Sequence, residues 1–233
     1  MKNFMLLFFM TILATANAGV IKMKLADFSG VEFTGNYTVE MVKSDSNYIV
    51  VDNRDDMKVS DSDIEIMVAN DILKMYIKQD LYTEKDISVK LYYKALNEVS
   101  GRRGVKIEGD TIVGTRVKIF ATTGGKIYVG TKAEHVDISI KSGGSVRVKG
   151  TTNTATYDVN AGGIIATSFL VAKAVEANIQ FGGEIILQAT ETLAASVKAG
   201  GTISYRGNPK LTRNTIKLGG TIEDLDEINK AKE

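Results

Sequence analysis

The sequence predicts an all-β protein: a right-handed parallel β-helix preceded by a β-rich N-terminal region. Three observations predict this fold. Glycine pairs recur at a nearly constant interval, apolar and polar residues alternate on both sides of each pair, and no stretch between pairs has helical periodicity. A constant interval is typical of a chain that turns the same corner on every lap of a solenoid.

Residues 1–18 are expected to form a secretory signal peptide. Lys2 precedes an apolar run from residue 4 to 14, and Ala16 and Ala18 form a small-residue cleavage pattern before Gly19. The run is shorter than the ~20 apolar residues that a transmembrane helix requires. We therefore expect export to the periplasm, the cell surface or the medium, with no transmembrane segment.

The composition narrows the classes of partner. The chain has no cysteine, which excludes disulfides and a lipid-modified cysteine at the cleavage site. Removal of Lys2 with the leader lowers the Lys and Arg count from 29 to 28, which balances the 28 Asp and Glu. A neutral mature chain lacks the basic field that nucleic acid binding requires, so no nucleic acid partner is expected.

Residues 19–100 are expected to form a β-rich region that packs on the first laps of the helix. It lacks glycine pairs, but short segments of alternating polarity are separated by polar turns. Such a region would cover an open end whose unpaired backbone would otherwise favour aggregation. The segments are 31–34, 38–42, 47–51, 64–68, 73–78 and 87–93.

Residues 101–222 are expected to form the β-helix itself, with about six laps of about 19 residues. The intervals between glycine pairs are 19, 19, 20, 18 and 19 residues. Glycine permits positive φ and removes the Cβ that would clash with the corner of the neighbouring lap. The predicted corners are Gly124 and Gly125, Gly143 and Gly144, Gly162 and Gly163, Gly182 and Gly183, Gly200 and Gly201, and Gly219 and Gly220.

Around each corner the pattern of side chains is that of two short strands. The residue three positions after the first glycine is Ile or Val in every lap, and the residue three positions before it is Ala, Ile or Val. β-Branched side chains in such columns stack on their equivalents one lap away. Residues 223–233 are charged and are expected to form a C-terminal cap or tail.

Several segments resemble the GIN head domain family of autotransporter adhesins, exported β-helical proteins of Bacteroidetes-like bacteria. They are FSGVEFTGNYTVEMVKSDSNYIVV, ILKMYIK, ISVKLYYKALNEVSG and, most specifically, G-G-T-I-x-Y-x-G-N-P at 200–209. The resemblance covers residues 25–222 and implies an exported β-helix with an adhesive or cell-surface role. It implies no catalytic residues. Many members look like lipoproteins, from which this chain departs because it has no cysteine.

Three acidic residues, Asp137, Asp158 and Glu176, are expected on the outside of successive laps. Asp137 and Asp158 would lie about 8 Å apart, a separation suited to an inverting glycosidase. On a solvated face near Lys118, Lys141 and Arg213, however, we expect these carboxylates to stay ionised and to lack catalytic activity.

The remaining candidates are binding residues. Arg102 and Arg103 form a basic turn that could contact an anion or a sugar, and Tyr92 and Tyr93 must point to opposite faces of one strand. His135, the single histidine, is expected in a surface loop. We expect no metal and no cofactor.

These observations favour an exported, non-enzymatic protein that presents a β-helical binding face to a glycan or to a surface or matrix protein. One alternative is a polysaccharide-active hydrolase or lyase that uses Asp137 and Asp158. Another is a structural or self-assembling module, in which the stackable ends of the helix give an oligomer.

Overall fold

The structure is a computed structural model that describes residues 15–17, 19–54, 59–78 and 86–230. Residues 1–14 and 18, most of the predicted signal peptide, lie outside the described residues, as do 231–233 at the end of the predicted C-terminal cap. Cleavage before Gly19 therefore stays a prediction.

The described chain is built almost entirely of β-strands, as the alternation of polarity indicates. The elements are β1 (Thr15–Asn17), β2 (Val20–Lys24), β3 (Gly30–Thr34), β4 (Thr38–Lys43), β5 (Tyr48–Asp52), a 3₁₀ turn (Asp61–Asp63), β6 (Ile64–Ala69), β7 (Ile72–Ile77), β8 (Ser88–Tyr93), β9 (Glu98–Arg102), β10 (Lys106–Thr122), β11 (Lys126–Ser142), β12 (Ser145–Ala161), β13 (Ile164–Phe181), β14 (Glu184–Ala199), β15 (Thr202–Arg206), β16 (Lys210–Leu218), β17 (Thr221–Asp224) and α1 (Leu225–Lys230).

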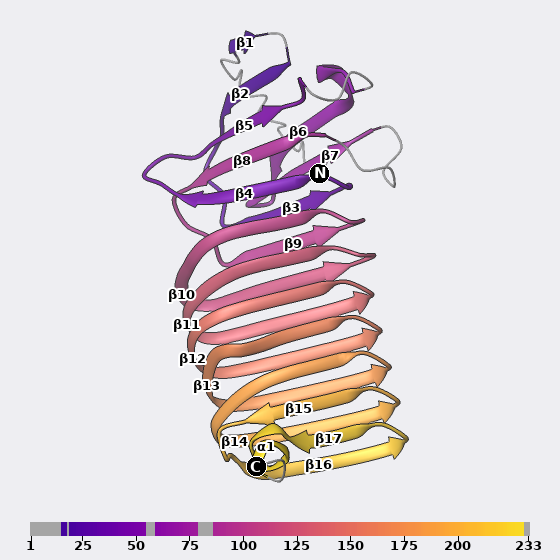
Figure 1. Cartoon of the computed structure of the whole chain (residues 1–233). Coiled ribbons are helices and arrows are strands. Elements are labelled where there is room, and N and C mark those ends of the chain that lie inside the picture. Colours follow the sequence, from indigo (N-terminus) through magenta and orange to yellow (C-terminus); the bar gives the residue numbers. More distant parts are fainter. Residues whose placement is uncertain (1–14, 18, 55–58, 79–85, 231–233) are drawn as a thin grey trace, which may run out of the picture.

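The strands from β10 onward form the predicted solenoid, with successive turns stacked in parallel (Figure 1). The register keeps equivalent residues above one another, so each inward column is aliphatic from turn to turn. One such column is Ile107, Ile127, Val146, Ile165, Ile185 and Ile203, all fully buried. The all-β solenoid class is confirmed.

The solenoid has about seven turns, one more than the six that the glycine pairs predict. The two ends of β10 pair in parallel with β4 and with β9, so the ladder continues into the N-terminal third. The corner between β9 and β10 is formed by Arg103 and Gly104, whose φ values are +58° and +87°. Because this corner has only one glycine, counting glycine pairs misses the turn.

The N-terminal strands lie above the first solenoid turn in two ladders (Figure 1). In one ladder β4 pairs with β8, β8 with β5, and β5 with β2; in the other β9 pairs with β3, β3 with β7, and β7 with β6. The buried side chains form a single cluster that runs from Leu25 to Tyr205. The predicted division between residues 100 and 101 stays a proposal.

The two glycines of a corner differ in what they require. At Gly182, φ is +68° and a Cβ would meet no atom within 4 Å, so only the backbone conformation favours glycine. At Gly183, φ is +114°, and a Cβ would lie 2.7 Å from Val159 Cγ1 and 2.9 Å from the Gly163 carbonyl oxygen. Gly125 departs from the expected positive φ: it is required because a Cβ would lie 2.3 Å from the Gly101 carbonyl oxygen.

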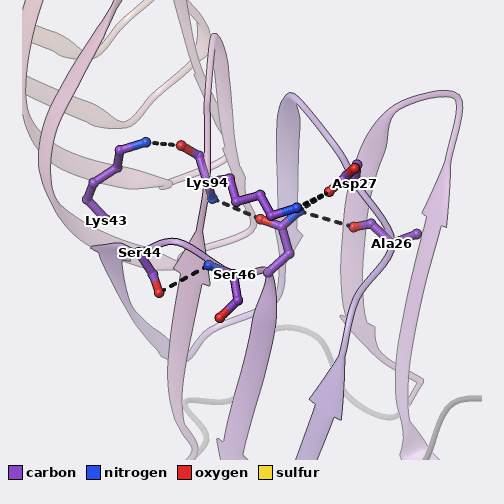
Figure 2. Close-up of polar contacts among 7 residues, drawn as sticks. Ala26, Asp27, Lys43, Ser44, Ser46 and Lys94 are labelled. Atoms are coloured by element: carbon purple, nitrogen blue, oxygen red, sulfur yellow. Dashed lines mark hydrogen bonds and ion pairs between the residues drawn. The ribbon is translucent and has the colours of Figure 1, made fainter.

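A polar cluster joins three N-terminal segments, which carry Asp27, Lys43 and Lys94 (Figure 2). The buried side chain of Asn47, next to the Lys43 segment, bonds to the other two. The Asn47 amide nitrogen donates to the carbonyl of Ala26 and to the carboxylate of Asp27, and its amide oxygen accepts from the backbone N–H of Lys94 at 2.8 Å. The Lys94 ammonium lies 3.0 Å from the Asp27 carboxylate, and Lys43 donates to the Lys94 carbonyl. These bonds satisfy a buried amide and hold the connecting loops in place.

The C-terminal end of the solenoid is only partly covered. α1 packs near β15, whereas β16 pairs with β14 and leaves Leu211, Ile216 and Leu218 exposed. Among the described residues, no helix has both the length and the apolar surface needed to cross a bilayer.

Gly182 and Gly183 provide a matched test of corner geometry. Gly182→Ala should lower the free energy of unfolding by about 1 kcal/mol, the cost of a left-handed residue. Gly183→Ala should lower it by about 3 kcal/mol or more, because it adds a backbone clash to the strain. Gly182→Asn is the control and should cost less than Gly182→Ala. Equal losses in denaturant unfolding for the two Ala variants would contradict the corner geometry.

Candidate functional site

The most distinctive surface feature is a groove across β10 to β13, here called the Phe169 groove, of about 510 Å³. Outward side chains of successive turns form its floor, because neighbouring residues on a strand point to opposite faces. Glu108, Tyr128, Arg147 and Ala166 occupy one outward column of the ladder. The groove is lined by Glu108, Gly109, Tyr128, Val129, Arg147, Val148, Lys149, Ala166, Ser168 and Phe169.

An irregularity in β13 forms one wall of this groove. Arg147 on β12 pairs with Ala166 on β13, and Lys149 pairs with Phe169. Between these two pairs, β13 contains one residue more than β12. Towards β14, residues 168–170 have no partner. β-Bulges of this kind redirect side chains, and Phe169 is 82% exposed. Ala166, a small residue, lies between Arg147 and Ile186 in its column.

The groove carries an excess of positive charge. The Arg147 guanidinium lies over the Tyr128 ring, 5.6 Å from its centre, a contact that steadies it while its edge keeps free N–H donors. Neither Arg147 nor Lys149 forms an ion pair with a described residue. The groove's acid, Glu108, is paired with Lys106 at 2.8 Å. Two cations are therefore available to a ligand.

A second groove lies on a neighbouring outer face of the same turns. Its lining includes Val113, Lys132, Thr151, Val171 and Lys173. Val113 is 70% exposed, but no aromatic side chain lines this groove. It offers less apolar contact to a ligand than the Phe169 groove does.

The predicted binding residues are not brought together. Tyr92 lies on β8 and stacks on Tyr48 with ring centres 4.1 Å apart, whereas Arg102 lies on β9, in the other ladder, paired with Glu32 at 3.0 Å. The Tyr93 side chain faces the core, at 1% exposure, and so lies away from any ligand on the surface. Burial, with a smaller effect of Asp110, raises the pKa of Tyr93 to about 12. A role for Tyr92, Arg102 or Arg103 in binding stays a prediction.

The outward carboxylates form a polar network on another face of the solenoid. Asp137 accepts from Arg116 at 2.6 Å, and Glu176 accepts from Arg213 at 2.8 Å. The Asn178 amide lies between Asp158 at 3.1 Å and Glu176 at 3.5 Å. His135 contacts the Thr154 hydroxyl in the next turn. None of these carboxylates lines either groove described above.

The expectation that all three acids stay fully solvated needs one correction. Partial burial raises the pKa of Asp158, despite the hydrogen bond from Asn178, and the charges of Glu176 and Asp137 add to the rise. The hydrogen bond from Arg213 lowers the pKa of Glu176. Among the described residues, no three acidic or histidine side chains are grouped so that they could hold a metal.

Sequence reasoning missed Phe169, Tyr128, Arg147 and Lys149. A signal was present: the intervals between glycine pairs deviate to 20 and then 18 residues around Gly182, which marks the irregular turn. Within that long turn, Phe169 is an aromatic residue next to the small residue Ser168.

A family model described as "Putative auto-transporter adhesin, head GIN domain" matches residues 27–209. A putative adhesin from Bacteroides fragilis is 21% identical over 91% of this chain and 98% of its own, with a TM-score of 0.77. A protein from Parabacteroides distasonis, described as a putative lipid binding protein, has the same identity and coverage, with a TM-score of 0.71. A putative adhesin from Parabacteroides merdae is 20% identical over 88% and 95%, with a TM-score of 0.66. No curated protein matches the chain.

Asp158 and Glu176 should affect stability with opposite dependence on pH. The folded chain holds the Asp158 proton more tightly than the unfolded chain, so this group's contribution falls as pH rises from its ordinary value of 3.8 through its raised pKa. The contribution of Glu176 is present above its ordinary value of 4.5 and is lost as pH falls through its lowered pKa.

Asp158→Asn should therefore raise the free energy of unfolding slightly near neutral pH. Glu176→Gln should lower it by up to about 1 kcal/mol, the range for an exposed ion pair. Both differences should vanish in acid, where the parent carboxyls are protonated. Thermal melts across pH test this expectation, and a neutral-pH loss of stability in Asp158→Asn would contradict it.

Proposed function

The chain belongs to the family described as "Putative auto-transporter adhesin, head GIN domain", and from this we propose that it is an exported, non-enzymatic binding protein. It acts at a cell surface or in the periplasm, where an outer face of the solenoid contacts a glycan or a surface or matrix protein. The observation that carries the proposal is the Phe169 groove, where a largely exposed aromatic ring lies beside two cations on the outer face of the solenoid.

Exposure of Phe169 is unfavourable unless a partner covers the ring. A ring that is 82% exposed keeps most of its apolar area in water, and burying a large apolar side chain is worth about 1.5–3 kcal/mol. The β12 and β13 ladder holds the groove's side chains on rigid strands, so a ligand would meet a preformed surface. This arrangement favours binding rather than core packing as the role of Phe169.

A lipid is a less favoured ligand, although one similar structure is described as a putative lipid binding protein. The interior columns of the described turns are filled by buried aliphatic side chains, including Ile127, Val146, Ile165 and Ile185. An acyl chain would therefore have to bind on the outer surface. Binding of lipid vesicles provides a separate measurement of this alternative.

A hydrolase that uses Asp137 and Asp158 is the competing proposal from another class. The raised pKa of Asp158 favours it, since a general acid must hold a proton. Against it, Asp137 is tied to Arg116 at 2.6 Å, and neither carboxylate lines a described groove. A glycosidase cleft must surround the scissile sugar, so we favour binding without turnover.

The test applies the mature chain to arrays of glycans, matrix proteins and lipid vesicles. We expect saturable binding to a glycan or protein, weakened by Phe169→Ala at least about tenfold, a loss of about 1.4 kcal/mol. Phe181→Ala is the control, because Phe181 is also exposed, at 55%, but lies outside the groove. Equal effects of both variants, or cleavage of a polysaccharide that Asp158→Asn abolishes, would overturn the proposal.

Export has its own test. When the full chain is expressed in a bacterium, the exported form should begin at Gly19, because Ala16 and Ala18 form the cleavage pattern. N-terminal sequencing of the periplasmic fraction measures this. An Ala18→Leu variant should accumulate with Met1 retained, and unprocessed parent protein in that fraction would contradict the prediction.

A further inference from the structure

We infer that the Phe169 groove selects an acidic sugar: a glycan segment whose carboxylate is bound by Arg147 and Lys149 while one face of its ring lies against Phe169. This inference rests on the proposed function and specifies the chemical class of the ligand. Nothing in the family description or in the names of the similar structures assigns such a site.

The charges of the groove call for an anion. Arg147 and Lys149 are both exposed and have no carboxylate partner among the described residues, whereas Glu108 is neutralised by Lys106 at 2.8 Å. The chain as a whole carries a net charge of only +1. The two cations of the groove can therefore bind one carboxylate of a ligand.

The geometry of Arg147 favours a carboxylate over other anions. Its guanidinium lies over the Tyr128 ring at 5.6 Å, a contact that reduces the rotamer freedom lost on binding. A planar fork with parallel N–H donors matches the two oxygens of a carboxylate. Lys149 lies two residues further along β12 and adds a second donor at the same edge.

The position of Phe169 supplies the apolar half of the site. Phe169 pairs with Lys149 in the adjacent turn. The Phe169 backbone is therefore one strand spacing across and two residues along from the Arg147 backbone, a distance of about 8 Å. One sugar ring and its carboxylate can span this separation. Ala166, which pairs with Arg147 and has only a methyl side chain, also lines the groove. An apolar wall with a few convergent polar groups is typical of small-ligand sites.

The test compares oligogalacturonate with its fully methyl-esterified form, which has the same sugar rings but no free carboxylates. Calorimetry with the mature chain should show saturable binding of the acid and at least about tenfold weaker binding of the ester, a difference of about 1.4 kcal/mol. A sulfated oligosaccharide of equal length is the third ligand and should bind more weakly than the carboxylate. Raising the salt concentration should weaken binding of the acid.

Matched variants locate the site. Arg147→Gln should weaken oligogalacturonate binding at least about tenfold, and Arg147→Lys should restore only part of it, because lysine lacks the fork. Lys198→Gln is the control: Lys198 lies 5.6 Å over the Phe181 ring, a similar cation and aromatic pair outside the groove. We expect it to leave affinity unchanged. Melting temperatures of all variants should match the parent, since these side chains are exposed.

The outcomes separate this inference from the proposed function. Equal binding of the acid and the ester, or tighter binding of the sulfated ligand, overturns the choice of a carboxylated sugar. If no acidic glycan binds but Phe169→Ala abolishes binding to a matrix protein, the inference fails and the binding function stands. If neither glycans nor proteins bind, both fail.

Discussion

The structure depends on in-register stacking of turns that must all follow the same path. At each corner, one carbonyl oxygen accepts the ladder hydrogen bond from the next turn: Gly163 accepts from Glu184 N–H at 2.9 Å, and Gly183 from Thr202 N–H at 3.0 Å. The second glycine of the next corner approaches that same carbonyl, so a Cβ there would lie 2.9 Å from the oxygen at Gly183 and 2.8 Å at Gly201. Glycine at this position keeps the carbonyl oxygen accessible to the N–H of the next turn. These corner hydrogen bonds set the register, and the register places the buried aliphatic residues in columns.

A scaffold this regular places functional variety on its outer surface and in its departures from the repeat. The inward columns admit little change, since each side chain packs on its equivalents one turn away. Outward positions are free to vary, and an extra residue can be absorbed as a bulge. β13 contains such a bulge, and the most exposed aromatic side chain of the described chain, Phe169, lies beside it. The rigid ladder around it fixes the spacing of Arg147, Lys149 and the ring.

The sequence was sufficient to predict the solenoid, because the glycine pairs and the alternation of polarity directly reflect the repeat. It was insufficient for the first turn, where Arg103 takes a left-handed conformation at a position that has no glycine. The alternation of side chains along a strand correctly predicted that Tyr92 and Tyr93 point to opposite faces of β8. It did not reveal which of the two faces the core. The alternation of polarity also did not reveal the partial burial that raises the pKa of Asp158. The Phe169 groove requires residues from four strands, and the sequence signalled it only through a 20-residue interval.

The central claim is that the N-terminal strands and the solenoid form one continuous ladder with a shared core. Native-state hydrogen exchange of the full chain, read by mass spectrometry, tests it most directly. The structure predicts the strongest protection in β11 to β13, with comparable protection across the junction of β9 and β10. Among the described solenoid strands, it predicts the weakest protection in β16 and β17, each of which pairs with a strand on one side only. Early exchange at β9 and β10, separating two independently protected blocks, would contradict a single ladder.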